Sequence, residues 1–191
     1  MLTKLSNRFY AGTRGWHILL VFVVLVGWMV VTLPGLTAVS HNIEGLDTMF
    51  FYTPDEAFAN VAAYTAEARQ AINQFHLTVD VVNPILYTAF LILLISWLFR
   101  RGFTPESKVR PLNIMPLGAL LFDILENVFI TIMMSAYPGQ PRLVAWLATA
   151  STMAKFGFIY VSLALILVGL AGAIRRKFNK IVAGEPASAI K

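Results

Sequence analysis

The 191-residue sequence contains no cysteine and little charge of either sign. Without cysteine the chain can form no disulfide, no thiolate nucleophile, no cysteine-ligated zinc site and no iron–sulfur cluster. Only 13% of the residues are charged and 58% are hydrophobic, whereas soluble domains have about 25% charged and roughly 45–50% apolar residues. This composition indicates an integral membrane protein that crosses the bilayer more than once.

Histidine is also scarce, and its spacing argues against a metal site. The three histidines, His17, His41 and His76, are scattered and form no HExxH motif or close pair. Sequence motifs for metal binding place their ligands at such short, regular spacings. We therefore expect neither a metal ion nor another cofactor.

Four segments are long and apolar enough to cross a membrane as helices, which takes roughly 20 residues each. They cover about residues 16–33, 79–99, 112–135 and 143–174. The sequence thus predicts an all-α integral membrane protein, a four-transmembrane-helix bundle with residues 1–180 as a single domain. The fourth segment is longer than a bilayer requires and is expected to tilt or to project into the cytoplasm. Residues 181–191 are predicted to be a flexible tail.

The basic residues are distributed asymmetrically around these segments. Three precede the first span, four separate the second from the third, and five follow the fourth, whereas only Arg69 and Arg142 lie on the other side. The positive-inside rule then places both termini in the cytoplasm. The net charge of +5 is therefore an orientation signal, and we expect no nucleic-acid partner. The small size and short loops favour a cell membrane of the bacterial inner-membrane type.

A cleavable signal peptide is the alternative interpretation of the first span. A basic start, an apolar run and the triplet Ala38-Val39-Ser40 are typical of such a leader. The apolar run is longer than a usual signal sequence, and the charge asymmetry fits an uncleaved helix. We therefore favour the membrane span.

The one sizeable extramembrane region, residues 34–77, is predicted to be an extracytoplasmic loop that contains a short amphipathic helix over about 54–72. Its expected start is Thr53-Pro54-Asp55-Glu56. Threonine is a good N-cap residue, proline is favoured in the first turn, and acidic side chains suit a helix N-terminus.

Polar residues recur at helical spacing inside the second and third spans. In the third span Asp123, Glu126 and Asn127 share one helix face. In the second, a continuous helix would align a longer stripe that runs from the outer surface into the bilayer: Arg69, Asn73, His76, Asp80, Asn83 and Tyr87. Pro84 lies within this stripe and is expected to kink the helix, because it cannot donate to the carbonyl of Asp80.

Lys155 in the fourth span supplies a charge of opposite sign. The helical rise places it level with Asp123, and Tyr87 level with Glu126, in the outer half of the membrane. A charge at the bilayer centre costs about 2.5–3.5 kcal/mol even on the insertion scale, so these groups should face inward, pair, line a water-filled cavity or lose their charge. We expect Lys155 to pair with Asp123 or Glu126, which leaves one carboxylate able to share or relay a proton.

These residues predict an outward-opening intramembrane polar pocket among spans two, three and four that binds a lipid-like or small amphiphilic ligand. The hypothesis allows acid–base chemistry, with Glu126 or Asp123 as the proton-handling acid and Lys155 as the charge partner. The expected ligand-positioning residues are Asp80, Asn83, Tyr87 and Asn127, with Arg69 and His76 at the entrance.

Two alternatives remain open at this point. In the first, the protein is a non-catalytic assembly or accessory protein whose polar residues fix helix packing. In the second, it is a proton- or ion-coupled transporter, which with four spans would need to be an oligomer. Membrane lipids are expected contacts in every case, and a second copy or another membrane protein is an expected partner in the alternatives.

Overall fold

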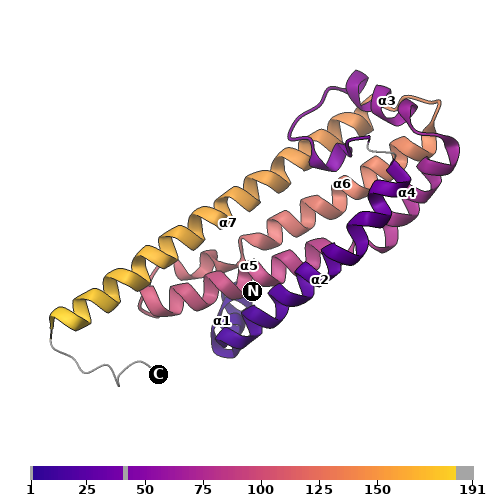
Figure 1. Cartoon of the computed structure of the whole chain (residues 1–191). Coiled ribbons are helices and arrows are strands. Elements are labelled where there is room, and N and C mark those ends of the chain that lie inside the picture. The colour runs from indigo at the N-terminus through magenta and orange to yellow at the C-terminus, as the bar shows by residue number, and fades with distance from the viewer. Residues whose placement is uncertain (1, 41–42, 184–191) are drawn as a thin grey trace.

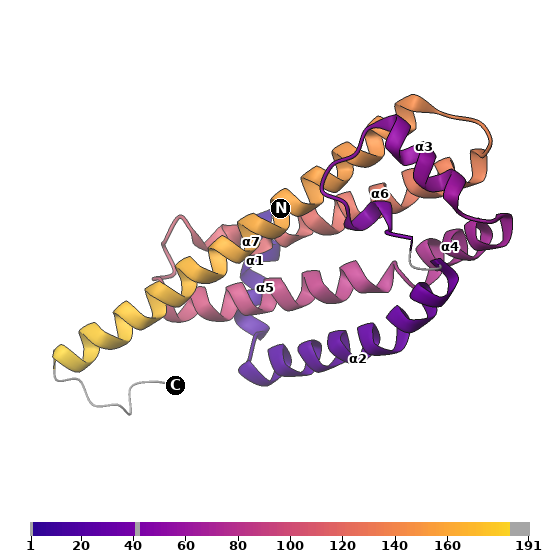
Figure 2. The same cartoon turned by 45° about the horizontal axis from the view of Figure 1, so that its top comes forward.

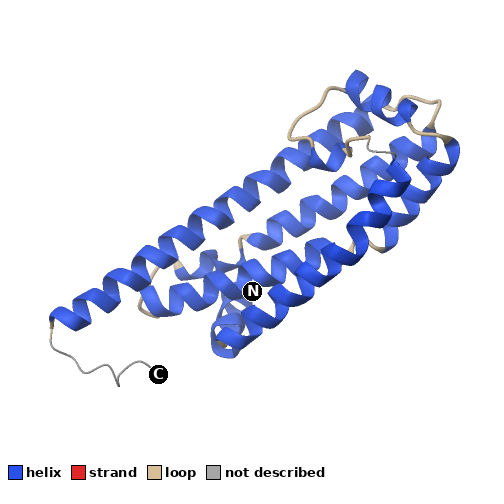
Figure 3. Ribbon diagram, viewed as in Figure 1, coloured by secondary structure: helices blue, strands red, loops and turns tan. Residues whose placement is uncertain are grey.

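The computed structural model describes residues 2–40 and 43–183, and every regular element in this part of the chain is helical (Figure 3). The elements are, in order, α1 (Leu2–Gly12), α2 (Gly15–Ser40), η1 (Leu46–Thr48), α3 (Pro54–Ala63), α4 (Ala66–Thr78), α5 (Val82–Gly102), η2 (Arg110–Ile114), α6 (Pro116–Ala136) and α7 (Arg142–Val182). The prediction of an all-helical fold is confirmed for the described residues. Most of the tail expected over 181–191 lies outside them, and α7 continues to Val182.

Four stretches of the described chain are long and apolar enough to cross a membrane. They are Gly15–Ala38, Ala66–Gly102, Arg110–Ala136 and Arg142–Val182, and each contains most or all of one predicted span. With 41 residues, α7 is about 60 Å long at 1.5 Å per residue, roughly twice the hydrocarbon thickness of a bilayer. Its C-terminal part extends beyond the other helices (Figure 1).

The helices run roughly side by side along one long axis (Figures 1 and 2). α7 packs against both α5 and α6, while α2 lies against α5 and α4. The antiparallel register of the second and third spans follows from their bonded pairs, since Asn73 bonds Ser135, Asp80 bonds Asn127 and Tyr87 bonds Asp123. Residue numbers increase along the second span from Asn73 to Tyr87 while those of their partners decrease from Ser135 to Asp123, so the two helices run antiparallel. Asp80 and Tyr87 of the predicted stripe therefore meet Asn127 and Asp123 of the third span along one seam.

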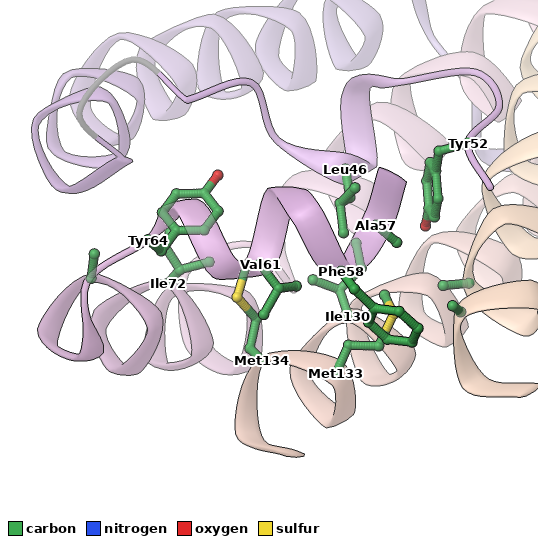
Figure 4. Close-up of a cluster of buried hydrophobic side chains, with 13 residues drawn as sticks. Leu46, Tyr52, Ala57, Phe58, Val61, Tyr64, Ile72, Ile130, Met133 and Met134 are labelled. Carbon is green, nitrogen blue, oxygen red and sulfur yellow. The ribbon is translucent and has the colours of Figure 1, made fainter. Parts of the chain in front are cut away.

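The loop after α2 folds into a cap over the α3 end of the bundle. Buried side chains of the cap, including Tyr52, Phe58 and Val61, cluster with Ile130 and Met133 of α6 (Figure 4). The start of α3 is the predicted one: Thr53 Oγ1 accepts from Glu56 N, and the Glu56 carboxylate accepts from Thr53 N at 2.7 Å. These bonds hold the pKa of Glu56 below its usual value.

Two helix boundaries differ from the prediction. α2 does not end near residue 33 but continues through Pro34 to Ser40. The single helix expected over 54–72 is divided into α3 and α4, because Thr65 has an extended backbone and its side chain caps the N–H of Ala68. A second N-cap so soon after the first could have been read from the Thr-Ala-Glu-Ala sequence.

The opposite end of the bundle is closed by α1, a helix that the sequence analysis did not predict. Ser6 donates to Asn113 Oδ1 at 2.6 Å, and Asn113 Nδ2 donates to Ser96 Oγ at 2.8 Å. Arg100 donates to the carbonyls of Tyr10 and Thr13 at the end of α1. These bonds tie α1 to η2 and α5, and satisfy helix-terminal carbonyls.

Close contact between α5 and α7 depends on glycine. A Cβ built at Gly169 would lie 2.9 Å from Leu98 Cβ and 2.9 Å from Phe99 Cδ1. A Cβ at Gly157, also on α7, would meet nothing within 4 Å. The two positions therefore form a matched pair for testing the crossing.

We predict that Gly169→Ala destabilises the protein by about 1–3 kcal/mol, because the added methyl group overpacks the contact with Leu98. Gly157→Ala should be neutral or slightly stabilising, since alanine favours helix. Thermal unfolding of both purified variants in detergent measures the difference. Equal stability of the two variants would contradict the α5–α7 packing.

Candidate functional site

A buried ion pair joins α6 to α7 at the centre of the polar cluster. Lys155 Nζ lies 2.5 Å from Glu126 Oε2, and the exposed fractions of the two residues are 6% and 0%. Thr152 donates its hydroxyl proton to the other oxygen of Glu126. Lys155 also donates to the main-chain carbonyl of Asp47, at 2.8 Å. Of the two pairings expected for Lys155, the structure contains the one with Glu126.

The remaining acid of the third span, Asp123, belongs to a different contact. Tyr87 donates its hydroxyl proton to Asp123 Oδ2 at 2.8 Å, across the seam between α5 and α6. Tyr87 and Asp123 were both predicted to face the pocket, and the structure brings them together.

Asp80 connects a histidine of α4 with an amide of α6. Its Oδ2 is 3.3 Å from His76 Nδ1 and accepts from Asn127 Nδ2 at 3.1 Å. His76 is only 5% exposed. The histidine expected at the entrance of the pocket is therefore largely buried and bound to an acid.

The other predicted ligand-positioning residues have separate surroundings. Arg69 donates to the carbonyls of Val61 and Tyr64 and lies over the ring of Tyr137, with 3.9 Å from Cζ to the ring centroid. It thus holds the α3–α4 turn and lies outside the bonded cluster. Asn83 is partly buried, and its Oδ1 has no hydrogen-bond partner among the described residues.

The second span is interrupted where the sequence analysis assumed a continuous helix. Val79, Asp80 and Val81 lie between α4 and α5. Asp80 N bonds back five residues to Phe75 O, and Val82 N bonds back three residues to Val79 O. The break occurs just before Pro84, which has no N–H to donate to the carbonyl four residues earlier. The predicted kink is thus an irregular turn of three residues, in which Val79 and Val81 keep right-handed helical backbone angles.

A crevice of about 330 Å³ lies beside this break. The end of α2, the loop around η1, the connection between α3 and α4, and the helices α4 and α6 all contribute to its walls. The lining residues include Thr37, Ser40, Asp47, Ile72, His76 and Ile130. The predicted pocket lay among spans two, three and four. The observed crevice instead uses α2 of the first span, because Lys155, Thr152 and the Asp47 carbonyl fill the α7 side of the cluster.

A second hollow, of about 370 Å³, lies on the outer face of α4 near the end of α6. Arg69, Asn73 and Tyr137 contribute to its wall. It is open and shallow compared with the crevice, and it is separated from the Glu126–Lys155 pair.

Sequence reasoning missed several groups of the site. Thr152 lies three residues before Lys155, so helical spacing alone could have placed it beside the lysine. Asp47 contributes its main-chain carbonyl, which every residue possesses. The identity of residue 47 therefore could not predict this contact. Tyr52 is fully buried, its N–H donates to Thr149 Oγ1, and burial raises the pKa of its phenol.

No group of three or more His, Asp or Glu residues within the described ranges is arranged to hold a metal ion. The cluster contains carboxylates, amides, a phenol, an imidazole and an ammonium group, which can pair charges, form hydrogen bonds and exchange protons. Comparison with protein-family models, curated proteins and solved structures gives no match for this chain. The proposals below therefore rest on its own geometry.

We predict that Lys155→Met alone destabilises the protein by about 3–5 kcal/mol, because it leaves the carboxylate of Glu126 buried without its charge partner. The double change Glu126→Leu/Lys155→Met should cost less than Lys155→Met alone, since it removes both charges and the Thr152 hydroxyl can then donate to the Ala148 carbonyl, 3.1 Å away. Thermal unfolding of the single and double variants completes the cycle. Additive losses would show that the pair is not coupled.

Proposed function

We propose that this chain is a four-span membrane protein that binds a lipid-like or small amphiphilic ligand in the crevice between α2, the η1 loop, α4 and α6. The observation that carries the proposal is the crevice itself, in which apolar walls such as Leu36 and Ile130 meet the polar group of His76. Ligand pockets of about 300–1,000 Å³ with a few placed polar groups are typical of small-molecule sites. At about 330 Å³, the crevice suits one small amphiphile or one end of a longer chain.

The exposed apolar surface supports the membrane setting. Only 6% of the most apolar stretch of α2 and 17% of that of α7 is buried inside the protein. Exposed apolar patches of this extent are rare on soluble monomers and suit contact with lipid chains. Because α2 forms one wall of the crevice, a ligand could enter from the lipid phase alongside it.

The charge distribution supports an orientation with both termini in the cytoplasm. The basic residues of α1 and of the α5–η2 connection lie at the end of the bundle opposite α3 (Figure 1). With that end inside, the cap, the crevice and the polar cluster lie toward the outer side. The cell membrane, of the bacterial inner-membrane type, remains our proposed location.

Within the crevice, His76 is the side chain best placed for acid–base work. Its Nδ1 faces Asp80, which leaves Nε2 as the ring nitrogen available to a ligand. A carboxylate behind a histidine fixes its tautomer and favours its protonated form, as in hydrolytic triads. We assign a supporting role to the groups next to the His76–Asp80 contact. Glu126 or Asp123 would exchange the proton, and Lys155 would balance the charge. Tyr87, Asn83 and Asn127 do not line the crevice, so they are not assigned to contact with its ligand.

A second candidate function is that of a non-catalytic assembly protein. The closed network around Glu126 favours it, because Lys155 and Thr152 occupy both oxygens of a carboxylate that is 0% exposed. A network of this kind fixes how α6 meets α7. Ligand retention by the crevice distinguishes the two functions.

The absence of native cysteine makes the orientation directly testable. We predict that Ala59→Cys, on the exposed face of α3, reacts with a membrane-impermeant maleimide on intact cells. Glu106→Cys, exposed in the α5–η2 connection, should react only after permeabilisation. The cysteine-free parent is the background control. The reverse labelling pattern would overturn the orientation, and equal labelling of both sites on intact cells would overturn the membrane topology.

Ligand binding is tested by filling the crevice. We predict that Thr37→Trp, in the crevice wall, weakens retention of a dansyl-labelled fatty amine or fatty acid by about tenfold or more, because the indole occupies the ligand's volume. Val30→Trp, on the exposed surface of the same helix, should behave like the parent. Probe fluorescence, and native mass spectrometry of co-purified lipid, measure the effect. Undiminished binding by Thr37→Trp would rule out the crevice as the site.

A further inference from the structure

The interruption between α4 and α5 is an unusual feature for a segment this apolar. Residues Ala66–Gly102 form one 37-residue candidate span, yet Val79–Val81 lie outside α4 and α5, and the regular helical hydrogen bonding is replaced there by bonds from Asp80 N to Phe75 O and from Val82 N to Val79 O. Non-helical backbone at membrane depth is tolerated where it is buried in protein or lines a polar cavity. In transport proteins, interrupted spans use the freed carbonyl groups at the break to bind small cations.

Pro84 leaves one such carbonyl at the break. It has no N–H, so the main-chain oxygen of Asp80, four residues earlier, receives no helical hydrogen bond from it. The Asp80 side chain is 17% exposed and lies at the same place. Asp80 therefore offers both a carboxylate and a carbonyl oxygen beside the interrupted backbone.

Two amide oxygens on the adjoining seam lack donors. Asn127 is 3% exposed, and its Nδ2 is committed to Asp80, yet its Oδ1 has no partner. The Oδ1 of Asn83 is likewise buried and unpartnered within the described part of the chain. A buried acceptor without a donor is destabilising, so these oxygens are available to a bound group.

The antiparallel register brings these two asparagines to the same level. Tyr87 bonds Asp123 across the seam, and moving one helical turn along each helix leads from Tyr87 to Asn83 and from Asp123 to Asn127. The bond between Asp80 and Asn127 lies at this level of the seam too. Asn83 and Asn127 thus lie between two carboxylates, Asp80 and Asp123.

The charge of this part of the cluster is negative. Lys155 is bound to Glu126 and to the Asp47 carbonyl, and Asp123 is held by a neutral phenol. The imidazole of His76 contacts Asp80 and carries a charge only when it is protonated. A bound group that satisfies the seam should therefore accept oxygen lone pairs and carry positive charge.

We propose that the α5–α6 seam is a monovalent-cation site formed by Asp80, Asn83 and Asn127, with Asp123 close by. Hard cations prefer carboxylate, amide and carbonyl oxygens. One carboxylate and two neutral amide oxygens suit a single positive charge better than two. Na⁺ and a primary ammonium group share this chemistry. The site is distinct from the crevice, whose walls include neither Asn83 nor Asn127.

Thermal unfolding of the purified protein in zwitterionic nanodiscs tests the site. At equal ionic strength, NaCl or methylammonium chloride should raise the Tm by about 3 °C over choline chloride, because a ligand that binds only the folded state stabilises it. A rise with Na⁺ alone identifies a free ion, and a rise with methylammonium alone identifies an amine group. The same Tm in all of these salts overturns the proposal and leaves water as the occupant.

Two variants locate the effect. Asn83→Leu removes one oxygen and should abolish the cation-dependent rise without lowering the Tm in choline. Thr131→Val removes another buried, unpartnered oxygen, on α6 one turn beyond Asn127, and should retain the rise. Loss of the rise in Thr131→Val, or its persistence in Asn83→Leu, would show that the cation binds elsewhere. Thr37→Trp should leave the rise intact, which separates this site from ligand binding in the crevice.

Discussion

The buried contact between Glu126 and Lys155 is the interaction on which the arrangement of the α3 end of the bundle depends. It joins α6 to α7 at one register, and the second bond of Lys155, to the Asp47 carbonyl, draws the η1 loop down onto the same point. Breaking a buried ion pair costs several kcal/mol, because one charge is left without compensation. The pair therefore couples the helix register to the position of the cap.

The two sides of the polar cluster differ in how completely their side chains are hydrogen-bonded. On the α7 side, Thr152, Lys155 and Glu126 satisfy one another and leave no room for a ligand. On the α5 side, Asn83 and Asn127 have unpartnered oxygens and the backbone is interrupted. Buried polar groups are almost always paired. The unpartnered polar atoms of the cluster named here therefore lie on its α5 side.

His76 links the two candidate sites. It lines the crevice and contacts Asp80, whose carboxylate also belongs to the proposed cation site. A cation beside Asp80 would disfavour the protonated imidazolium, since like charges repel. Occupancy of the seam and the charge of the group that faces an amphiphile are therefore expected to depend on each other.

The sequence by itself determined the number of apolar spans, the start of α3 and the grouping of Asp123, Glu126 and Asn127 on one face, because hydropathy, capping and helical periodicity are local properties. It also supplied Lys155 as a partner for a third-span acid. The tertiary structure decided which acid Lys155 binds, that α1 closes one end, and that α2 rather than α7 forms a wall of the crevice. Those outcomes depend on which faces meet across the bundle, and on main-chain groups such as the Asp47 carbonyl, which have no residue-specific signal.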